Sequence, residues 1–190
     1  MKIPIEISAR HIHITKQHLE VLFGAGYRLR PKRELSQPGQ FAAQETVSLV
    51  GPRGQIENVR ILGPCRDYTQ VEIALTDAYH LGIKPPVRCS GNLAGSAPIT
   101  IIGPKGKLDL AEGAILAWRH IHFDPDSAQS AGVEDGQMVK VRVEGERGLI
   151  FFNVRVRVSP HYKLAMHLDT DEANAAGIQP GSWGEIIVEN

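Results

Sequence analysis

The sequence predicts a mainly β protein with two similar β-barrel modules that come from an internal duplication and are capped by short α-helices. Three observations lead to this prediction. Short stretches in which apolar and polar residues alternate are separated by turn sequences that contain glycine and proline. The sequence RHIHI at residues 10–14 returns as RHIHF at residues 119–123. Other short sequences also return in the same order, which indicates a repeated architecture.

The repeat extends well beyond the two RHIH sequences. The sequence NVRI at residues 58–61 returns as NVRV at residues 153–156, and GIKP at residues 82–85 returns as GIQP at residues 177–180, in both cases 95 positions later. The RHIH sequences are 109 positions apart, so the first half contains about 14 additional residues, which we place in a loop at residues 28–43.

The repeat also defines the expected domain organisation. A chain of 190 residues could form one domain or two small, closely packed ones. Residues 1–86 are expected to form a first β-barrel module and residues 115–190 a second one. Residues 87–114 would supply connecting strands that contribute to the barrels.

The first half is predicted to contain four main strands and two short helices. Thr15 can cap a helix at residues 16–23, and Thr76 with Asp77 can cap a helical turn that ends at Gly82. The strands are expected at residues 3–13, 46–50, 55–62 and 70–75, with a GPRG hairpin turn between the second and third.

The second half repeats this order. Asp124 and Pro125 can begin a short helix, because proline is favoured at the first helical position. Another helix is expected at residues 170–176 and would end at Gly177. The strands are expected at residues 115–122, 138–143, 149–158, 164–168 and 184–188.

The composition argues against several classes of function. Basic and acidic residues balance at 21 each, so no basic field is available for nucleic acid or a membrane surface. No stretch approaches the roughly 20 apolar residues that a membrane span needs. The two cysteines, Cys65 and Cys89, have no CxxC spacing, and no signal peptide precedes the first strand, so a reducing cytoplasm is the expected location.

Each RHIH strand offers a pair of histidines to a metal ion. Side chains at positions i and i+2 of a strand point to the same face, roughly 6.5 Å apart, so His11 can share an ion with His13. The same holds for His120 and His122. One such pair is commonly a coincidence, whereas two pairs at equivalent positions of a repeat favour metal binding.

The repeat supplies a third ligand in each half, because Glu72 is equivalent to His167 at the offset of 95. Three protein ligands leave a coordination position open, as in catalytic zinc sites, whereas structural zinc usually has four. Sets of three histidines, or of two histidines and a glutamate, suit Zn²⁺, although other divalent metals remain open. We therefore expect two zinc ions in a binuclear centre, typically about 3.5–4 Å apart.

Four sequences point to a known enzyme family. They are SARHIH at residues 8–13, LSQPGQFAA at residues 35–43, QVEI at residues 70–73 and MHLDTDEAN at residues 166–174. Over nearly its whole length the chain resembles the PduL-type phosphate acyltransferases, usually named phosphate propanoyltransferases. The resemblance implies two closed β-barrels, two zinc ions and reversible transfer of a propanoyl or acetyl group between coenzyme A and inorganic phosphate.

The resemblance also implies roles for individual residues. One zinc ion would be held by His11, His13 and Glu72, and the other by His120, His122 and His167. Arg66 would be the catalytic residue that binds phosphate. The positions expected to face coenzyme A are Ser8, Arg10, Arg53, Arg60 and Asn174.

Two features depart from the family pattern. Ala9 stands where asparagine is common, so a hydrogen bond from that side chain is not expected. The amphipathic N-terminal extension that directs some members into bacterial microcompartments is absent from this sequence. A cytoplasmic enzyme is therefore favoured over an encapsulated one, and acetyl-CoA becomes as suitable a substrate as propanoyl-CoA.

Two other interpretations remain open. A binuclear metallohydrolase would cleave a thioester or phosphoester with a metal-activated water, with Asp77 or Asp169 as the general base and no need for phosphate. A non-enzymatic protein would use zinc only to stabilise its barrels, although open three-ligand sites argue against this. The sequence leaves open whether the protein forms a homo-oligomer.

Overall fold

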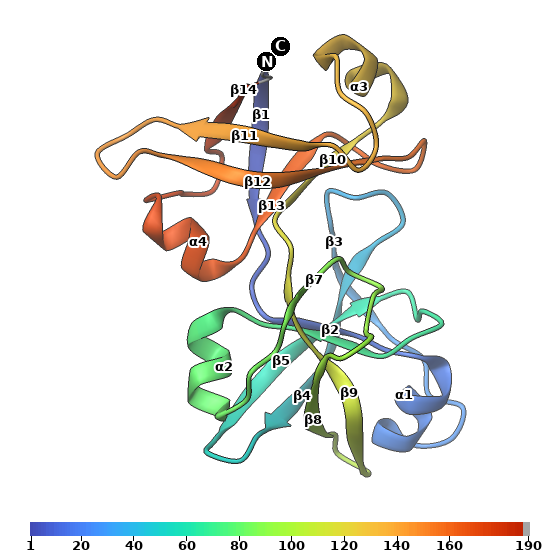
Figure 1. The fold of residues 1–190 in the computed structure, drawn as a ribbon. Helices are drawn as coiled ribbons and strands as arrows, with labels where there is room; N and C mark the ends of the chain where they lie inside the picture. Colours follow the sequence, from blue (N-terminus) through green and yellow to red (C-terminus); the bar gives the residue numbers. More distant parts are fainter. Residues whose placement is uncertain (188–190) are drawn as a thin grey trace. The chain divides into compact units, whose positions relative to one another are not determined.

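The computed structural model describes residues 1–187, and the chain divides into two compact units, each built around a β-barrel (Figure 1). Unit 1 combines Met1–Ala9 with the chain from Trp118 onward, and unit 2 is Arg10–Ala117. Among the described helices, none is both long enough and apolar enough to cross a membrane.

Unit 1 is a closed barrel of six strands in the order β1-β13-β10-β12-β11-β14. Their bounds are β1 (Lys2–Ile7), β10 (His120–Phe123), β11 (Met138–Val143), β12 (Leu149–Val158), β13 (Ala165–Leu168) and β14 (Trp183–Ile187). Helix α3 (Pro125–Ala131) follows β10, and helix α4 (Thr170–Ala175) follows β13. Alternate side chains of the strands fill the barrel, where Ile121, Phe123 and Val154 are fully buried.

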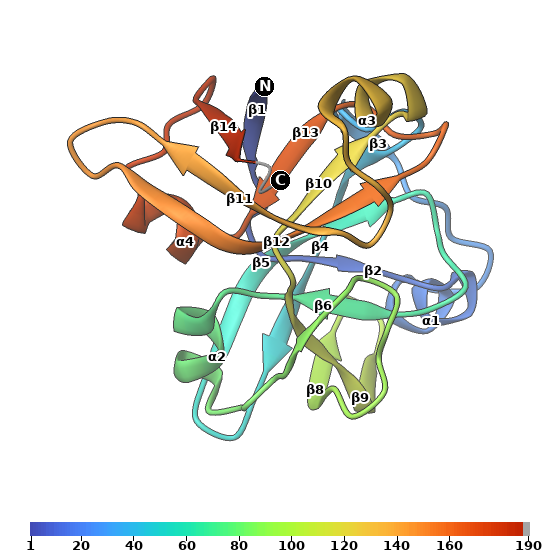
Figure 2. The same ribbon diagram turned by 45° about the horizontal axis from the view of Figure 1, so that its top comes forward.

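Unit 2 also closes into a barrel of six strands, because β8 pairs with both β9 and β4. Going around the barrel, these are β4 (Phe41–Val50), β5 (Gln55–Gly63), β2 (His11–His13), β6 (Gln70–Glu72), β9 (Lys107–Ala117) and β8 (Ala97–Ile102). Two further strands, β3 (Pro31–Glu34) and β7 (Val87–Arg88), pair with β4 and β9. Helix α1 (Lys16–Phe23) follows β2 and helix α2 (Leu75–Leu81) follows β6 (Figure 2). The predicted fold class is therefore confirmed.

The two barrels have the same strand pairing around their histidine strands. In unit 2, β2 is parallel to β5, with His11 opposite Arg60, and antiparallel to β6, with His11 opposite Glu72. In unit 1, β10 is parallel to β12 and antiparallel to β13, so that His120 lies opposite both Arg155 and His167. The duplication seen in the sequence is thus a duplication of structure.

The first strand of each repeat belongs to the barrel of the other repeat. Strand β1 precedes β2 in the chain but pairs in parallel with β13 of unit 1. In the same way, β9 precedes β10 but pairs in parallel with β6 of unit 2. The units therefore divide the chain after Ala9 and after Ala117. This division differs from the expected modules 1–86, 87–114 and 115–190, because sequence alternation does not tell which barrel a strand completes.

Two asparagines mark equivalent irregularities of the two barrels. Asn58 and Asn153 are the non-glycine residues with positive φ among residues 1–187, at 59° and 54°. At Asn58 the pairing of β4 with β5 shifts register, and at Asn153 the pairing of β11 with β12 shifts in the same way. Asparagine tolerates this left-handed conformation better than most residues, which explains why both halves have asparagine at this position.

Several predicted boundaries are wrong for reasons that the structure makes clear. The predicted strand at residues 3–13 is two strands, β1 and β2, because the chain passes from unit 1 to unit 2 after Ala9. The predicted strand at residues 115–122 is divided between β9 and β10 for the same reason. The predicted loop at residues 28–43 contains β3, whose four side chains are all exposed and so show no alternation.

The helix ends agree better with the sequence. Thr15 caps α1, and Pro125 is the first residue of α3, after the capping side chain of Asp124. Helix α2 begins at Leu75, one residue before the predicted cap. The last predicted strand ended at Val188, which lies outside the described residues.

A buried carboxylate on β4 binds residues at the start of the additional segment of unit 2, residues 28–43. The side chain of Glu45 is 1% exposed and accepts hydrogen bonds from the Tyr27 hydroxyl (3.0 Å) and from Nε of Arg30 (2.9 Å). Burial alone would raise the pKa of Glu45, but the hydrogen bonds from Arg30 and Tyr27 lower it below its usual value. Glu45 therefore stays ionised and holds the start of this segment against β4.

Two candidate metal centres

Unit 2 brings together the three ligands predicted for its metal ion. His11 and His13 lie on β2, and their Nε2 atoms are 3.2 Å apart. Glu72 lies on the neighbouring strand β6, with Oε2 3.5 Å from Nε2 of His11 and Oε1 3.6 Å from Nε2 of His13. All three side chains are buried. Two imidazole nitrogens and a carboxylate therefore converge on one small space.

The surroundings keep two of these ligands, His13 and Glu72, in the protonation state that a metal needs. Burial lowers the pKa of His13 to about 4, and the charges of His11 and Arg66 add to this lowering. Burial alone would raise the pKa of Glu72, but attraction to His11 and a hydrogen bond with His13 keep it below its usual range. A neutral His13 and an ionised Glu72 are ready to bind a cation without first losing a proton.

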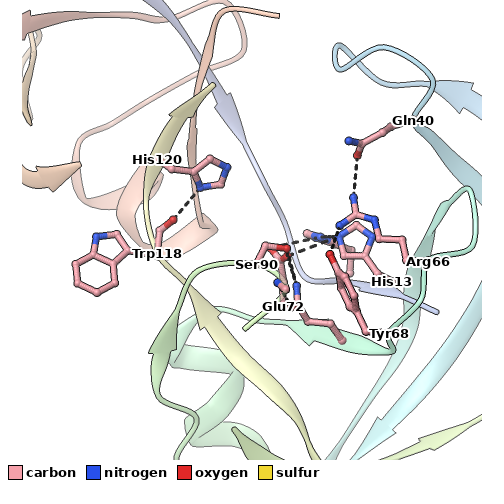
Figure 3. Close-up of polar contacts among 11 residues, drawn as sticks. His13, Gln40, Arg66, Tyr68, Glu72, Ser90, Trp118 and His120 are labelled. Carbon is pink, nitrogen blue, oxygen red and sulfur yellow. Dashed lines mark hydrogen bonds and ion pairs between the residues drawn. The ribbon is translucent and has the colours of Figure 1, made fainter. Parts of the chain in front are cut away.

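A partly buried polar network holds the Glu72 carboxylate (Figure 3). Oε1 of Glu72 accepts hydrogen bonds from Nε2 of Gln70 (2.6 Å) and from the hydroxyl of Ser90 (2.8 Å). The amide of Gln70 is fixed in turn, because its Oε1 accepts a hydrogen bond from the backbone N–H of Gly91 (2.7 Å). Residues that hydrogen-bond to a metal ligand without binding the metal themselves keep that ligand in its orientation. The sequence analysis assigned no role in the site to Gln70 or Ser90, although Gln70 lies two positions before Glu72 on the same strand.

Unit 1 brings together the three histidines predicted for the second ion. His120 and His122 lie on β10 and His167 on β13, with ring centroids 4.7, 4.8 and 5.1 Å apart. One ring nitrogen of each lies within 4.8 Å of the others. Nδ1 of His120 donates a hydrogen bond to the backbone oxygen of Trp118 (2.8 Å), an arrangement that favours the tautomer whose Nε2 carries no proton when the ring is neutral (Figure 3).

Aromatic packing supports the middle histidine of unit 1. The ring of Tyr162 stacks on His122 with centroids 4.0 Å apart. The guanidinium of Arg157 lies 5.6 Å from the centroid of the Tyr162 ring. The sequence analysis did not identify Tyr162 or Arg157, and nothing in the spacing of the sequence points to Tyr162. Their contacts depend on how β12 and the following loop pass the histidine strand.

The two donor sets fit a divalent metal ion. Each set has three side chains, so an ion bound by either would keep at least one coordination position for a substrate or water. Imidazole and carboxylate donors of this kind suit zinc, and cobalt, nickel and iron are close alternatives. The carboxylate of Glu72 and the neutral His13 match the state in which zinc is bound.

Arg66 lies at the end of the histidine strand of unit 2. Its backbone N–H donates to the backbone oxygen of Ile14 (2.9 Å), the residue after His13. Its guanidinium donates to the hydroxyl of Tyr68 (2.8 Å) and to Oε1 of Gln40 (3.3 Å) (Figure 3). Both acceptors are neutral, and no carboxylate within the described chain pairs with Arg66. The charge of Arg66 therefore remains available to an anion.

Arg10 and its repeat equivalent tie the ligand strands together. Arg10, directly before His11, forms an ion pair with Asp77 in α2, the helix that follows the Glu72 strand. Arg119, directly before His120, pairs with Glu172 of α4 at 3.2 Å. Burial raises the pKa of Glu172, with the nearby charge of Asp169 adding to the effect and Arg119 opposing it. In both units, therefore, an arginine connects the start of the histidine strand to the helix behind the third ligand.

Two other residues predicted to contact coenzyme A, Arg60 and Arg53, lie in unit 2. Arg60 lies opposite His11 and donates to the backbone oxygens of Ala43 (3.1 Å) and Gln44 (2.8 Å). Arg53 lies in the turn after β4, with its guanidinium 5.3 Å from the centroid of the Tyr79 ring. Contact of Ser8, Arg10, Arg53, Arg60 and Asn174 with coenzyme A stays a prediction.

Comparison with known proteins relates this architecture to one family. A family model described as phosphate propanoyltransferase matches residues 4–179. A phosphate propanoyltransferase of Lachnoclostridium phytofermentans is 54% identical over 167 residues, which cover 87% of this chain and 78% of that protein. That of Salmonella typhimurium is also 54% identical over 167 residues, which cover 87% and 79%. That of Alkaliphilus metalliredigens is 51% identical over 187 residues, which cover 98% and 88%.

With these relatives, the double barrel and its two ligand groups define an acyltransferase enzyme. The chain belongs to the phosphate propanoyltransferase family. The resemblance drawn from the sequences around the histidines is thereby confirmed.

Proposed function

We propose that this enzyme transfers a short acyl group, propanoyl or acetyl, between coenzyme A and inorganic phosphate, with one zinc ion bound in each unit. The observation that carries the proposal is the position of Arg66. Its half-buried guanidinium has only neutral partners and lies next to a histidine strand that presents two metal ligands. An uncompensated arginine beside a candidate metal centre suits a doubly charged anion such as hydrogen phosphate.

The reaction needs no covalent intermediate on the enzyme. An oxygen of hydrogen phosphate attacks the carbonyl carbon of the thioester and forms a tetrahedral intermediate. The carbon–sulfur bond then breaks, acyl phosphate is released, and the proton from hydrogen phosphate passes to the departing thiolate. Cys65 is a poor nucleophile for an alternative route, because burial raises the pKa of its thiol.

A bound ion would make each centre positive. A divalent ion held by two neutral imidazoles and the Glu72 carboxylate would give the unit 2 centre a charge of about +1, and one held by three neutral imidazoles would give the unit 1 centre about +2, and both charges favour phosphate and thiolate. Zinc, when bound, supplies Lewis acidity for the carbonyl oxygen and affinity for sulfur.

Arg66 would orient the phosphate. A guanidinium has five N–H donors in a fixed fork, and two of its nitrogens are held by Tyr68 and Gln40. These contacts fix the plane of the fork before substrate arrives. The remaining donors can bind two phosphate oxygens side by side and stabilise the charge that develops in the transition state.

A metallohydrolase remains the alternative, although the carboxylates proposed as its general base have other roles. Asp77 pairs with Arg10 and also accepts a hydrogen bond from the backbone N–H of Ala74 (3.3 Å). Asp169 caps α4 by accepting from the backbone N–H of Glu172 (2.8 Å). Neither carboxylate is free to take a proton from water without breaking a structural contact.

Release of free thiol from acyl-CoA distinguishes the two functions. Propanoyl-CoA and acetyl-CoA are incubated with enzyme, with and without phosphate, before and after treatment with a chelator. The proposal predicts thiol release that requires both phosphate and metal, and the two rates identify the preferred acyl group. Thiol release that does not depend on phosphate would identify a hydrolase and refute the proposal.

Three further properties stay predictions. The binuclear arrangement is tested by X-ray absorption of the zinc-loaded enzyme, where a second metal about 3.5–4 Å away adds a scattering shell. The cytoplasmic location is tested by fractionating cells that produce the enzyme, with recovery in microcompartments as the opposing result. Homo-oligomer formation is tested by light scattering.

A further inference from the structure

Glu6 of β1 lies beside the third metal ligand of unit 1. Strands β1 and β13 pair in parallel, with Glu6 opposite His167. Oε2 of Glu6 is 3.8 Å from Nδ1 of His167. Nε2, on the other side of the same imidazole ring, is buried. The carboxylate therefore lies on the Nδ1 side of the ring, opposite the buried nitrogen Nε2.

The equivalent position in unit 2 is apolar. Strands β9 and β6 pair in parallel in the same way, and Ile115, which is fully buried, lies opposite Glu72. The duplication thus gives the same backbone register with a different pair of side chains. The histidine ligand has a glutamate neighbour, and the glutamate ligand has an isoleucine neighbour.

Electrostatics explains this asymmetry. A carboxylate beside Glu72 would repel it and would favour protonation of one of the two groups. A carboxylate beside His167 instead attracts the N–H of the ring and makes the opposite nitrogen a better donor to a metal ion. Each unit therefore has one carboxylate for its dication, as a ligand in unit 2 and behind a ligand in unit 1.

We propose that Glu6 is a positioning residue that holds His167 in the orientation and tautomer needed for metal binding by unit 1. The inference rests on the proposed function, which places an ion in this unit. Glu6 acts on the ion only through His167. The Glu6 carboxylate faces Nδ1 of the His167 ring, whereas the ion would bind at Nε2 of the same ring. The separation of 3.8 Å is longer than a hydrogen bond, so Glu6 acts on the ring through ion–dipole attraction.

The test measures the zinc affinity of unit 1 alone. In a His13→Ala background the ligand group of unit 2 is broken, so competition with a fluorescent zinc chelator reports only on unit 1. Glu6→Gln keeps the size of the side chain and removes its charge, whereas Glu6→Ile copies unit 2. Both substitutions are expected to weaken zinc binding by about 10-fold or more, since the loss of an outer carboxylate partner typically costs 10–100-fold.

Two control variants test whether the effect is specific to Glu6 and to unit 1, and thermal unfolding tests for a loss of stability. Glu185→Gln removes another exposed carboxylate of the same barrel and should leave zinc affinity unchanged. Glu6→Gln in a His122→Ala background should leave the zinc affinity of unit 2 unchanged. Because Glu6 is about a third exposed, thermal unfolding of the metal-free variants should match that of their parents.

The outcomes are distinct. Zinc affinity of unit 1 that stays unchanged in both Glu6 variants would overturn the inference while leaving the proposed function intact. Failure of the parental His13→Ala protein to bind zinc would overturn the proposed ion in unit 1 and the role of Glu6 with it. The absorption spectrum of bound Co²⁺ provides a second measurement, because a reoriented His167 changes the geometry around the metal.

Discussion

Replacement of Arg66 by lysine tests whether the enzyme uses the shape of the guanidinium or only its charge. Lysine keeps the positive charge but has a single ammonium group on a flexible chain. It cannot donate to Tyr68 (2.8 Å) and Gln40 (3.3 Å) and also present two parallel N–H groups to phosphate. The substitution therefore removes the orientation of the anion while leaving the electrostatic attraction.

The size of the effect follows from the contacts that are lost. A hydrogen bond to a charged group contributes about 1.5–3 kcal/mol. Loss of one arm of the fork corresponds to a decrease of roughly 10- to 150-fold in kcat/KM for phosphate, since each 1.4 kcal/mol is tenfold. Most of this decrease should be in kcat, because the fork is matched to the transition state rather than to free phosphate.

The assay is thiol release from propanoyl-CoA over a range of phosphate concentrations. Arg142→Lys is the matched control, because this exposed arginine of unit 1 pairs with the surface carboxylates Glu144 and Glu185. The control should retain the wild-type kcat. If Arg66→Lys kept more than half of the wild-type kcat/KM for phosphate, the orienting role of the fork would be refuted.

Three other predictions concern the metal ligands and the stability of unit 2. Ser90→Ala removes a hydrogen bond to Glu72 and should weaken zinc binding by unit 2 about 10-fold, measured by chelator competition, whereas the surface change Thr100→Ala should not. Removal of zinc should abolish thiol release but leave the circular dichroism of the barrels intact, because their apolar cores form without the ligands; global unfolding on chelation would contradict this. Glu45→Gln should destabilise the protein by about 1–3 kcal/mol at pH 7, seen in urea unfolding. Because the pKa of Glu45 is lowered in the folded state, its contribution is complete above the unfolded value of about 4.5 and is lost at lower pH. The stabilities of the two proteins should therefore converge as the pH falls below this value; a constant difference would refute the ionic role.

The ligand groups could be predicted because the duplication repeats them in the sequence. Two HxH strands and the equivalence of Glu72 with His167 depend only on local periodicity and a constant offset. The structure then brings each predicted set of three together, with His11 opposite Glu72 and His120 opposite His167. The repeat was sufficient here because it identifies the third ligand of each group by equivalence, although β2 and β6 are separated by three other strands.

Other features depend on contacts that no local pattern records. The pairing of β1 with β13 joins residues from the two ends of the chain, so neither the exchange of first strands nor the position of Glu6 could be read from alternation. Strand β3 has four exposed side chains and no apolar face, which made it resemble a loop. Ser90, which donates a hydrogen bond to Glu72, lies in a turn 18 residues further along the chain. The two residues meet only in the folded barrel of unit 2.

The most direct test of the account is identification of the product by ³¹P nuclear magnetic resonance. Zinc-loaded enzyme is given propanoyl-CoA and inorganic phosphate, and the new phosphorus signal is compared with the free thiol released. The account predicts propanoyl phosphate in equal amount to the thiol, and neither product in the Arg66→Ala variant or after chelation. Thiol release with inorganic phosphate as the only phosphorus species besides coenzyme A would show hydrolysis and contradict the proposed transfer.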